Sequence, residues 1–173
     1  MTNFKEDLIR VKAFVFDIDG VLSLQTISLN GRGIPRRTVN LRDGYAIQLA
    51  VRKGYRVGII SGSNAKDYIK RLKSLGVTDV YLNSRVKTEH FNDFCSKYDI
   101  KPSDVMFMGD DIPDYEVMQR CGFAACPADA AQDIRAIAHY VSTAVGGKGA
   151  VREVLEHVLR AQDKWMDADA FVW

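Results

Sequence analysis

The sequence has few cysteines and almost no net charge. Its 173 residues include 3 cysteines, and 24 basic residues face 22 acidic ones for a formal charge of +2. An odd and small number of cysteines excludes a disulfide scaffold. The charge balance gives no basic surface of the kind that binds nucleic acid or an anionic membrane. We therefore expect neither as a partner.

Long apolar runs are also absent, and none approaches the ~18–20 residues that a membrane helix requires. The first segment, Met1 to Arg10, has no apolar core and does not resemble a signal peptide. Cys95, Cys121 and Cys126 lack the spacing of zinc or CxxC redox motifs and are expected to be buried, reduced thiols. Together these features predict a cytoplasmic protein. Its length and the lack of a linker or repeat predict one domain over residues 1–173.

Short apolar runs alternate with segments of helical spacing. The expected strands are Val11–Phe16, Arg56–Ile60, Asp79–Leu82, Val105–Met108, Phe123–Cys126 and His139–Val141. The expected helices are Tyr45–Val51, Ala65–Leu75, Thr88–Tyr98, Asp114–Cys121 and Ala150–Ala161. Runs this apolar are typical of strands buried on both faces. The alternation predicts an α/β fold with a Rossmann-like, doubly wound parallel sheet.

One stretch, from Leu22 to Leu41, interrupts this alternation. It contains Asn30-Gly31 between β-rich flanks at Thr26–Leu29 and Thr38–Leu41, a pattern typical of a hairpin. We therefore expect a β-hairpin, about residues 22–41, inserted after the first strand. The chain ends in the helix and tail of about residues 150–173, whose last residues are polar and aromatic.

Polar residues follow the expected strands. The first strand leads into Asp17-Ile18-Asp19-Gly20, the second into Ser61-Gly62-Ser63, and the fourth into Gly109-Asp110-Asp111-Ile112-Pro113-Asp114; Lys87 comes soon after the third. The carboxyl ends of parallel strands share one edge of a sheet, where ligands bind. Clustered carboxylates repel one another unless a cation lies among them, and hard oxygen ligands favour Mg²⁺. An aspartate there can attack phosphorus, and a second acid can exchange the proton.

These four ordered motifs resemble those of the haloacid dehalogenase superfamily of phosphatases. The resemblance implies that Asp17 is the nucleophile, which forms an aspartyl-phosphate, and that Asp19 is the general acid/base. It also implies that Ser61 and Lys87 hold the phosphoryl group. Mg²⁺ would be bound by Asp17, the backbone carbonyl of Asp19, and Asp110, with Asp111 or Asp114 in support.

The chain resembles a capless branch of that superfamily, the 3-deoxy-D-manno-octulosonate (KDO) 8-phosphate phosphatases of lipopolysaccharide biosynthesis. Asp17 and Ser61 are 44 positions apart, and Ser61 and Lys87 are 26 apart, which leaves no room for a cap domain. The resemblance rests on the segments 40–45, 109–114 and 146–153. It implies a sugar acid phosphate as the small-molecule substrate, bound by Asp19, Lys87, Asn40, Leu41, Arg42, Asp43, Gly44 and Arg71. It further implies a homotetramer in which the hairpin and tail of one subunit cover a neighbour's site.

Two departures from the sequence pattern of that branch leave the identity of the sugar acid undecided. Ser63 and Gln48 stand where its members commonly have arginines, and Arg85 is a candidate substitute. A nonulosonate 9-phosphate phosphatase is therefore one alternative, and a non-catalytic module that binds a cytidylyltransferase is another. A receiver-like domain is disfavoured because receivers lack this order of motifs. The arginines at 32, 36 and 37 either steer an anionic substrate or form a hairpin face that is solvated or part of a subunit interface.

Overall fold

A six-stranded parallel sheet forms the centre of the computed structural model, which describes residues 4–172, except for the side chain of Phe4. The strand order is β3-β2-β1-β4-β5-β6. The strands are β1 (Ala13–Phe16), β2 (Arg56–Ile60), β3 (Asp79–Tyr81), β4 (Val105–Met108), β5 (Phe123–Cys126) and β6 (Tyr140–Val141). All six predicted strands are present and the parallel α/β architecture is confirmed.

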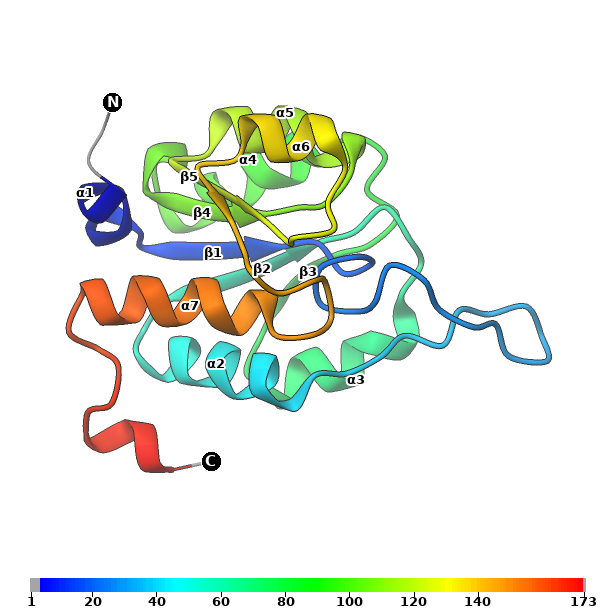
Figure 1. Ribbon diagram of the computed structural model, residues 1–173, viewed down its shortest axis with the longest axis horizontal. Helices are drawn as coiled ribbons and strands as arrows, with labels where there is room; N and C mark the ends of the chain where they lie inside the picture. Colours follow the sequence, from blue (N-terminus) through cyan, green and yellow to red (C-terminus); the bar gives the residue numbers. More distant parts are fainter. Residues whose placement is uncertain (1–3, 173) are drawn as a thin grey trace.

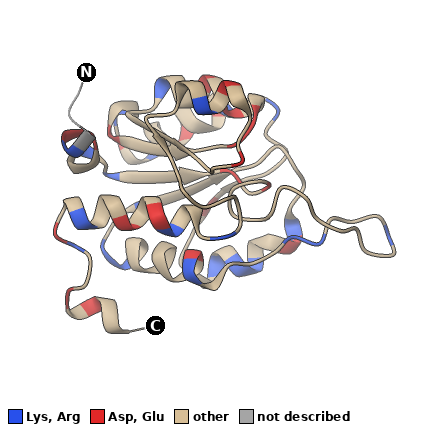
Figure 2. Ribbon diagram, in the orientation of Figure 1, with Lys and Arg blue, Asp and Glu red and all other residues tan. Residues whose placement is uncertain are grey.

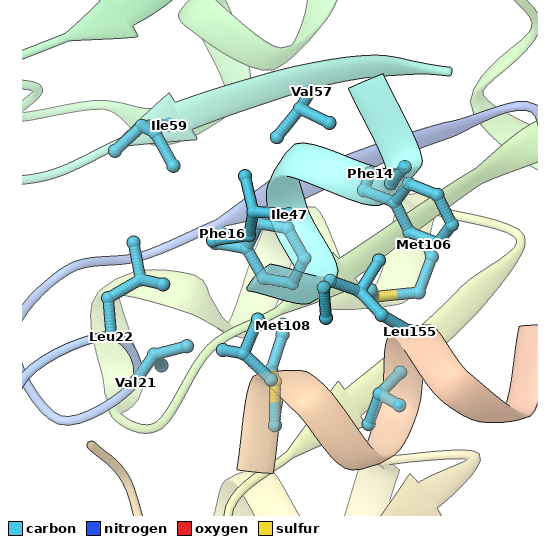
Figure 3. Close-up of a cluster of buried hydrophobic side chains, with 14 of the residues drawn as sticks. Phe14, Phe16, Val21, Leu22, Ile47, Val57, Ile59, Met106, Met108 and Leu155 are labelled. Atoms are coloured by element: carbon cyan, nitrogen blue, oxygen red, sulfur yellow. The ribbon is translucent and has the colours of Figure 1, made fainter. Parts of the chain in front are cut away.

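Helices cover both faces of this sheet (Figure 1). On one face lie α1 (Phe4–Arg10), α2 (Leu41–Arg52), α3 (Lys66–Ser74) and α7 (Ala150–Ala161); on the other lie α4 (Lys87–Tyr98), α5 (Tyr115–Arg120) and α6 (Gln132–Ile137). The strand sequences explain this arrangement, because successive side chains point to opposite faces. Phe14 and Phe16 pack with Ile47 of α2 and Leu155 of α7 (Figure 3). Their neighbour Val15 packs on the face of α4.

The starts of α2 and α7 are tied together by short polar side chains. Asn40 caps α2, its side-chain oxygen accepting hydrogen bonds from the backbone N–H groups of Arg42 at 2.9 Å and Asp43 at 3.1 Å. Asp43 in turn accepts a 2.7 Å hydrogen bond from the backbone N–H of Arg152 in the first turn of α7. Each of these bonds satisfies a backbone donor that a helix start leaves unpaired.

The predicted hairpin is only partly correct. Residues 24–39 form a projecting arm (Figure 1), whose antiparallel pairing consists of an isolated bridge between Leu29 and Pro35. Asn30 makes the turn, donating its backbone N–H to the carbonyl of Ile34 at 2.8 Å. The prediction of a β flank at Thr38–Leu41 is wrong, because Asn40 ends the arm as a helix cap. Pro35 has no N–H to donate, which also limits the pairing of the arm.

Two short helices, α1 and α6, are not among those expected from the sequence. The tail, for which no structure is expected, contains a 3-10 helix at Ala168–Phe171. The tail folds back on α2 of its own chain: Lys53 pairs with Asp167 and Asp169, and Arg52 donates to the carbonyl of Val172 at 2.7 Å. Among residues 4–172, no helix is long and apolar enough to cross a membrane.

Candidate active site

The loops after β1 and β4 meet at the carboxyl edge of the sheet. The chain crosses from β3 to β4 on the far side of β1, so a crevice opens between the ends of β1 and β4. The backbone N–H of Asp17 donates to the carbonyl of Met108 at 3.1 Å, which brings the two loops together. Gly20 has a φ of +87°, and a Cβ there would lie 2.0 Å from a carboxylate oxygen of Asp110. Only glycine fits between these loops.

Three buried carboxylates converge in that crevice. Asp17, Asp110 and Asp114 each present an oxygen within 4.8 Å of the other two. In Figure 2, the red of acidic residues appears on the loops that follow the central strands. The side chain of Asp17 is oriented by the backbone N–H of Ile18, which donates to Oδ1 at 2.7 Å. The strand-end cluster predicted from the sequence is therefore formed, with Asp114 as its third member.

Lys87 supplies the positive charge. Its Nζ lies 2.7 Å from Asp114 Oδ1 and 3.1 Å from Asp17 Oδ2, and its side chain is 3% exposed. The sequence placed Lys87 after the third strand, and the structure places it at the first residue of α4. Burial alone would lower the pKa of Lys87, but the two carboxylates more than offset this and raise it. Lys87 therefore stays protonated beside the two carboxylates.

One lysine does not balance three carboxylates. Burial, together with the nearby charge of Asp114, raises the pKa of Asp17 well above its usual range. The same two causes raise the pKa of Asp110 to about 7. The site thus holds more negative charge than its own cation neutralises. A small divalent cation with oxygen ligands would relieve this repulsion, and the donor set fits Mg²⁺.

Asp114 and Asp111, both candidates for support of the metal, have different surroundings. Asp114 accepts from Lys87 and, at 3.1 Å, from the backbone N–H of Asp110. Asp111 is exposed and accepts from the backbone N–H of Ile112 at 2.8 Å. Asp111 therefore caps the short helix that follows, whereas Asp114 belongs to the buried cluster.

Ser61 lies across the crevice at the end of β2. Its hydroxyl is 2.9 Å from the hydroxyl of Ser63 and accepts a 3.3 Å hydrogen bond from the backbone N–H of Ser63. These serines line a cavity of about 300 Å³ together with Asp17, Asp19, Lys87 and Asp110. The predicted catalytic and metal-binding residues are therefore brought together around one cavity.

The predicted substrate-binding set lies mostly elsewhere. Asp19 and Lys87 line the cavity, whereas residues 40–44 form the cap and first turn of α2 and are not among its lining residues. Arg71 of α3 approaches Gly44, where an added Cβ would lie 2.5 Å from its Nη2. Burial raises the pKa of Asp43 to about 6, although the N–H groups of Arg152 and Gly149 oppose this. In this chain, residues 40–44 join helices together.

Two residues that touch the site are not singled out by the sequence. Gln25 donates to Asp110 at 3.4 Å, and Arg37 pairs with Asp19. Both come from the arm, whose residues have no regular spacing relative to the strand ends. The arginines at 32, 36 and 37 are all candidates for steering an anionic substrate, but nothing in the sequence separates Arg37 from the other two.

Comparison with known proteins agrees with this geometry. A family model described as haloacid dehalogenase-like hydrolase matches residues 38–122. The chain is also 37% identical over 158 residues to the KDO 8-phosphate phosphatase of Escherichia coli, covering 91% of this chain and 84% of that one. The chain belongs to the haloacid dehalogenase-like hydrolases.

The similarity extends to solved structures. The KDO 8-phosphate phosphatase of Yersinia pestis superposes with a TM-score of 0.89 at 34% identity, over 92% of this chain and 86% of the other. That of Moraxella catarrhalis, in complex with a magnesium ion, a phosphate ion and a KDO molecule, gives a TM-score of 0.88 at 30% identity, over 92% and 91%. Over about nine-tenths of its length, this chain is thus similar in sequence and in fold to KDO 8-phosphate phosphatases.

Proposed function

We propose that this chain is a Mg²⁺-dependent phosphomonoesterase that hydrolyses KDO 8-phosphate to KDO and inorganic phosphate. The observation that carries the proposal is the buried cluster of Asp17, Asp110 and Asp114 around Lys87. It has the charge pattern of a site that binds a cation and a phosphoryl group together. The similarity to KDO 8-phosphate phosphatases over nine-tenths of the chain supports this substrate.

Asp17 is the nucleophile in this proposal. Its carboxylate attacks phosphorus, the bond from phosphorus to the sugar oxygen breaks, and an aspartyl-phosphate forms. The N–H of Ile18 holds one of its carboxylate oxygens, and Lys87 lies 3.1 Å from the other. Lys87 and the Ser61 hydroxyl would bind oxygens of the phosphoryl group during transfer.

Asp19 exchanges the proton. It donates to the sugar oxygen as that oxygen leaves, and it then takes a proton from the water that attacks the aspartyl-phosphate. The second step restores the Asp17 carboxylate and releases inorganic phosphate. The side chain of Asp19 is 37% exposed, which leaves it accessible to substrate and water at the cavity rim.

Mg²⁺ would be held by Asp17, Asp110 and the backbone carbonyl of Asp19. When bound, it neutralises charge on the transferring phosphoryl group. Asp114 accepts hydrogen bonds from Lys87 and from the backbone of Asp110. We therefore assign Asp114 the role of orienting these two residues.

Substrate binding by residues 40–44 and Arg71 remains a prediction, as does a homotetramer. The exposed apolar side chains of the arm, Leu29, Ile34 and Val39, support an assembly in which the arm packs against a neighbour. The buried free cysteines are compatible with the predicted cytoplasmic location. The single domain over residues 1–173 also remains a prediction.

Phosphate release from a panel of substrates tests this function. We expect KDO 8-phosphate to be hydrolysed with Mg²⁺ and not with EDTA, and to be preferred over nonulosonate 9-phosphates and nucleotides. A preference for a nonulosonate 9-phosphate would overturn the substrate assignment. Full activity in EDTA would overturn the role of the metal. Inactivity on every phosphate, with tight binding to a cytidylyltransferase, would favour the non-catalytic alternative.

A further inference from the structure

Arg37 of the arm makes two hydrogen bonds to the side chain of Asp19. Its Nε donates to Asp19 Oδ1 at 2.8 Å, and its Nη2 donates to Asp19 Oδ2 at 3.0 Å. The Arg37 side chain is only 4% exposed, whereas the Asp19 side chain is 37% exposed, so the guanidinium is buried behind a carboxylate that water can still reach. A paired contact between a planar guanidinium and a carboxylate fixes both the position and the plane of the carboxylate.

The same guanidinium connects Asp19 to the serines on the other side of the cavity. Its Nη2 also donates to the Ser63 hydroxyl at 3.1 Å, and that hydroxyl lies 2.9 Å from the hydroxyl of Ser61. A chain of hydrogen bonds thus runs from Asp19 through Arg37 to Ser61. On the outer side, Nη1 is held by Asp67 of α3 at 3.3 Å.

The other arginines of the arm have different surroundings. Arg36 is next to Arg37 in sequence and carries the same charge, but it is exposed. Arg32 near the turn is exposed too. Long-range attraction of an anionic substrate needs only positive charge, which exposed arginines such as Arg32 and Arg36 supply without any particular contact. The buried two-point contact is particular to Arg37 and calls for a different role.

We propose that Arg37 is a positioning residue that holds the Asp19 carboxylate where it exchanges its proton with the leaving oxygen and the attacking water. This inference rests on the proposed phosphatase function and adds a residue to it. Arg37 keeps all its own protons and acts through Asp19, not on the substrate itself. Because Arg37 belongs to the arm, the arm contributes to catalysis from within the same chain.

Three variants separate this role from others. Arg37→Met keeps most of the aliphatic part of the side chain and removes the guanidinium group that makes the two hydrogen bonds. Arg37→Lys keeps the charge but makes no two-point contact. Arg36→Met is the matched control, with the same change one residue away on the exposed side. Thermal unfolding and circular dichroism establish that each variant is folded before its kinetics are measured with Mg²⁺.

The leaving group of the substrate provides the readout. A sugar or alkyl oxygen needs a proton as it leaves, whereas p-nitrophenolate leaves readily without one. We expect Arg37→Met to lower kcat/KM by about 10- to 100-fold on KDO 8-phosphate and on an alkyl phosphate without a carboxylate. The loss on p-nitrophenyl phosphate should be only a few-fold. Arg37→Lys should recover part of the loss, as should added guanidinium ion below the concentration that unfolds Arg37→Met.

Several results would overturn the proposal. Equal losses on the alkyl and p-nitrophenyl substrates would indicate a general structural role. A loss confined to KDO 8-phosphate would mean that Arg37 binds the substrate carboxylate. If Arg36→Met lowered kcat/KM as much as Arg37→Met, the effect would be due to the positive charge of the arm and not to the contact with Asp19. An inactive wild-type protein on all three substrates would instead contradict the proposed function.

Discussion

The strand-end cluster and the segment from the arm to α2 reach the same edge of the sheet by different means. The cluster of Asp17, Asp110, Asp114 and Lys87 is placed by strand ends, by the first residue of a helix and by buried ion pairs. Residues 24–44 are placed by an isolated bridge, a turn and a helix cap. In the first region, buried carboxylates repel one another, which lowers the stability of the fold, and the side chains are placed for catalysis. In the second, short polar side chains mainly stabilise the backbone, while Gln25 and Arg37 reach carboxylates of the site.

The largest expected effect is at the nucleophile. We predict that Asp17→Asn lowers kcat by at least about 10⁴-fold, since an amide cannot form the acyl phosphate. The same change should raise the melting temperature in EDTA above pH 8, because ionised Asp17 is buried beside Asp114 and Asp110. Phosphate release and thermal unfolding measure the two effects. Residual activity near the wild-type level would disprove the role of Asp17.

The next largest effect is at Lys87. Lys87→Met leaves Asp17 and Asp114 without their cation, so we expect a loss of about 3–5 kcal/mol of stability in EDTA, in addition to the loss of activity. Lys97→Met on the same helix is the matched control. Lys97 pairs with Asp79 at 2.5 Å, and Asp79 is 3% exposed, but Lys97 itself is 53% exposed and Asp79 also accepts hydrogen bonds from Thr78 and Tyr98. This change should therefore cost clearly less than Lys87→Met. Urea unfolding would measure both, and equal losses would remove the distinction between the two lysines.

Metal binding should depend on pH through the same carboxylates. The pKa of Asp110 is raised to about 7 in the folded protein without metal, so this group contributes a stability that is lost as pH rises from its unfolded pKa through 7. Mg²⁺ needs the ionised form and should therefore stabilise the protein more at pH 8 than at pH 6. At 100 times its Kd, the stabilisation at pH 8 should be about 2.7 kcal/mol.

Thermal unfolding with and without Mg²⁺ at both pH values measures this difference. Asp110→Asn is the control, and the Mg²⁺ effect should largely disappear in it. A stabilisation that is the same at pH 6 and pH 8, or that survives in Asp110→Asn, would place the metal elsewhere.

The smallest expected effect is at the start of α2. Asn40→Ala removes the helix cap and should cost about 1 kcal/mol of stability. If residues 40–44 act only through the fold, KM for KDO 8-phosphate should change little in this variant and in Arg42→Ala. A large rise in KM in Arg42→Ala, with stability unchanged, would instead give this segment the substrate-binding role that the sequence resemblance implies.

The same contrast explains which features could be predicted from the sequence. The bounds of β2, β4 and β5 follow from short apolar runs. Asp17 and Asp110 lie within two residues of the ends of β1 and β4, so parallel topology brings them together. The arm was harder to predict because Asn-Gly indicates a turn but says nothing of how far its flanks pair. The contact of Arg37 with Asp19 joins residues 18 positions apart through an irregular segment. No periodic pattern marks such a contact.

The most direct test of the central claim is to locate the phosphorylated residue. Wild-type protein and Asp19→Asn would be mixed with KDO 8-phosphate and Mg²⁺, quenched, and treated with borohydride, which reduces an acyl phosphate on aspartate to homoserine. Peptide mass spectrometry would then identify the modified position. We predict homoserine at position 17, in a larger amount in Asp19→Asn if release of phosphate is slowed more than its transfer. Modification at Asp110 or Asp114 instead, or full turnover by Asp17→Asn, would contradict the account.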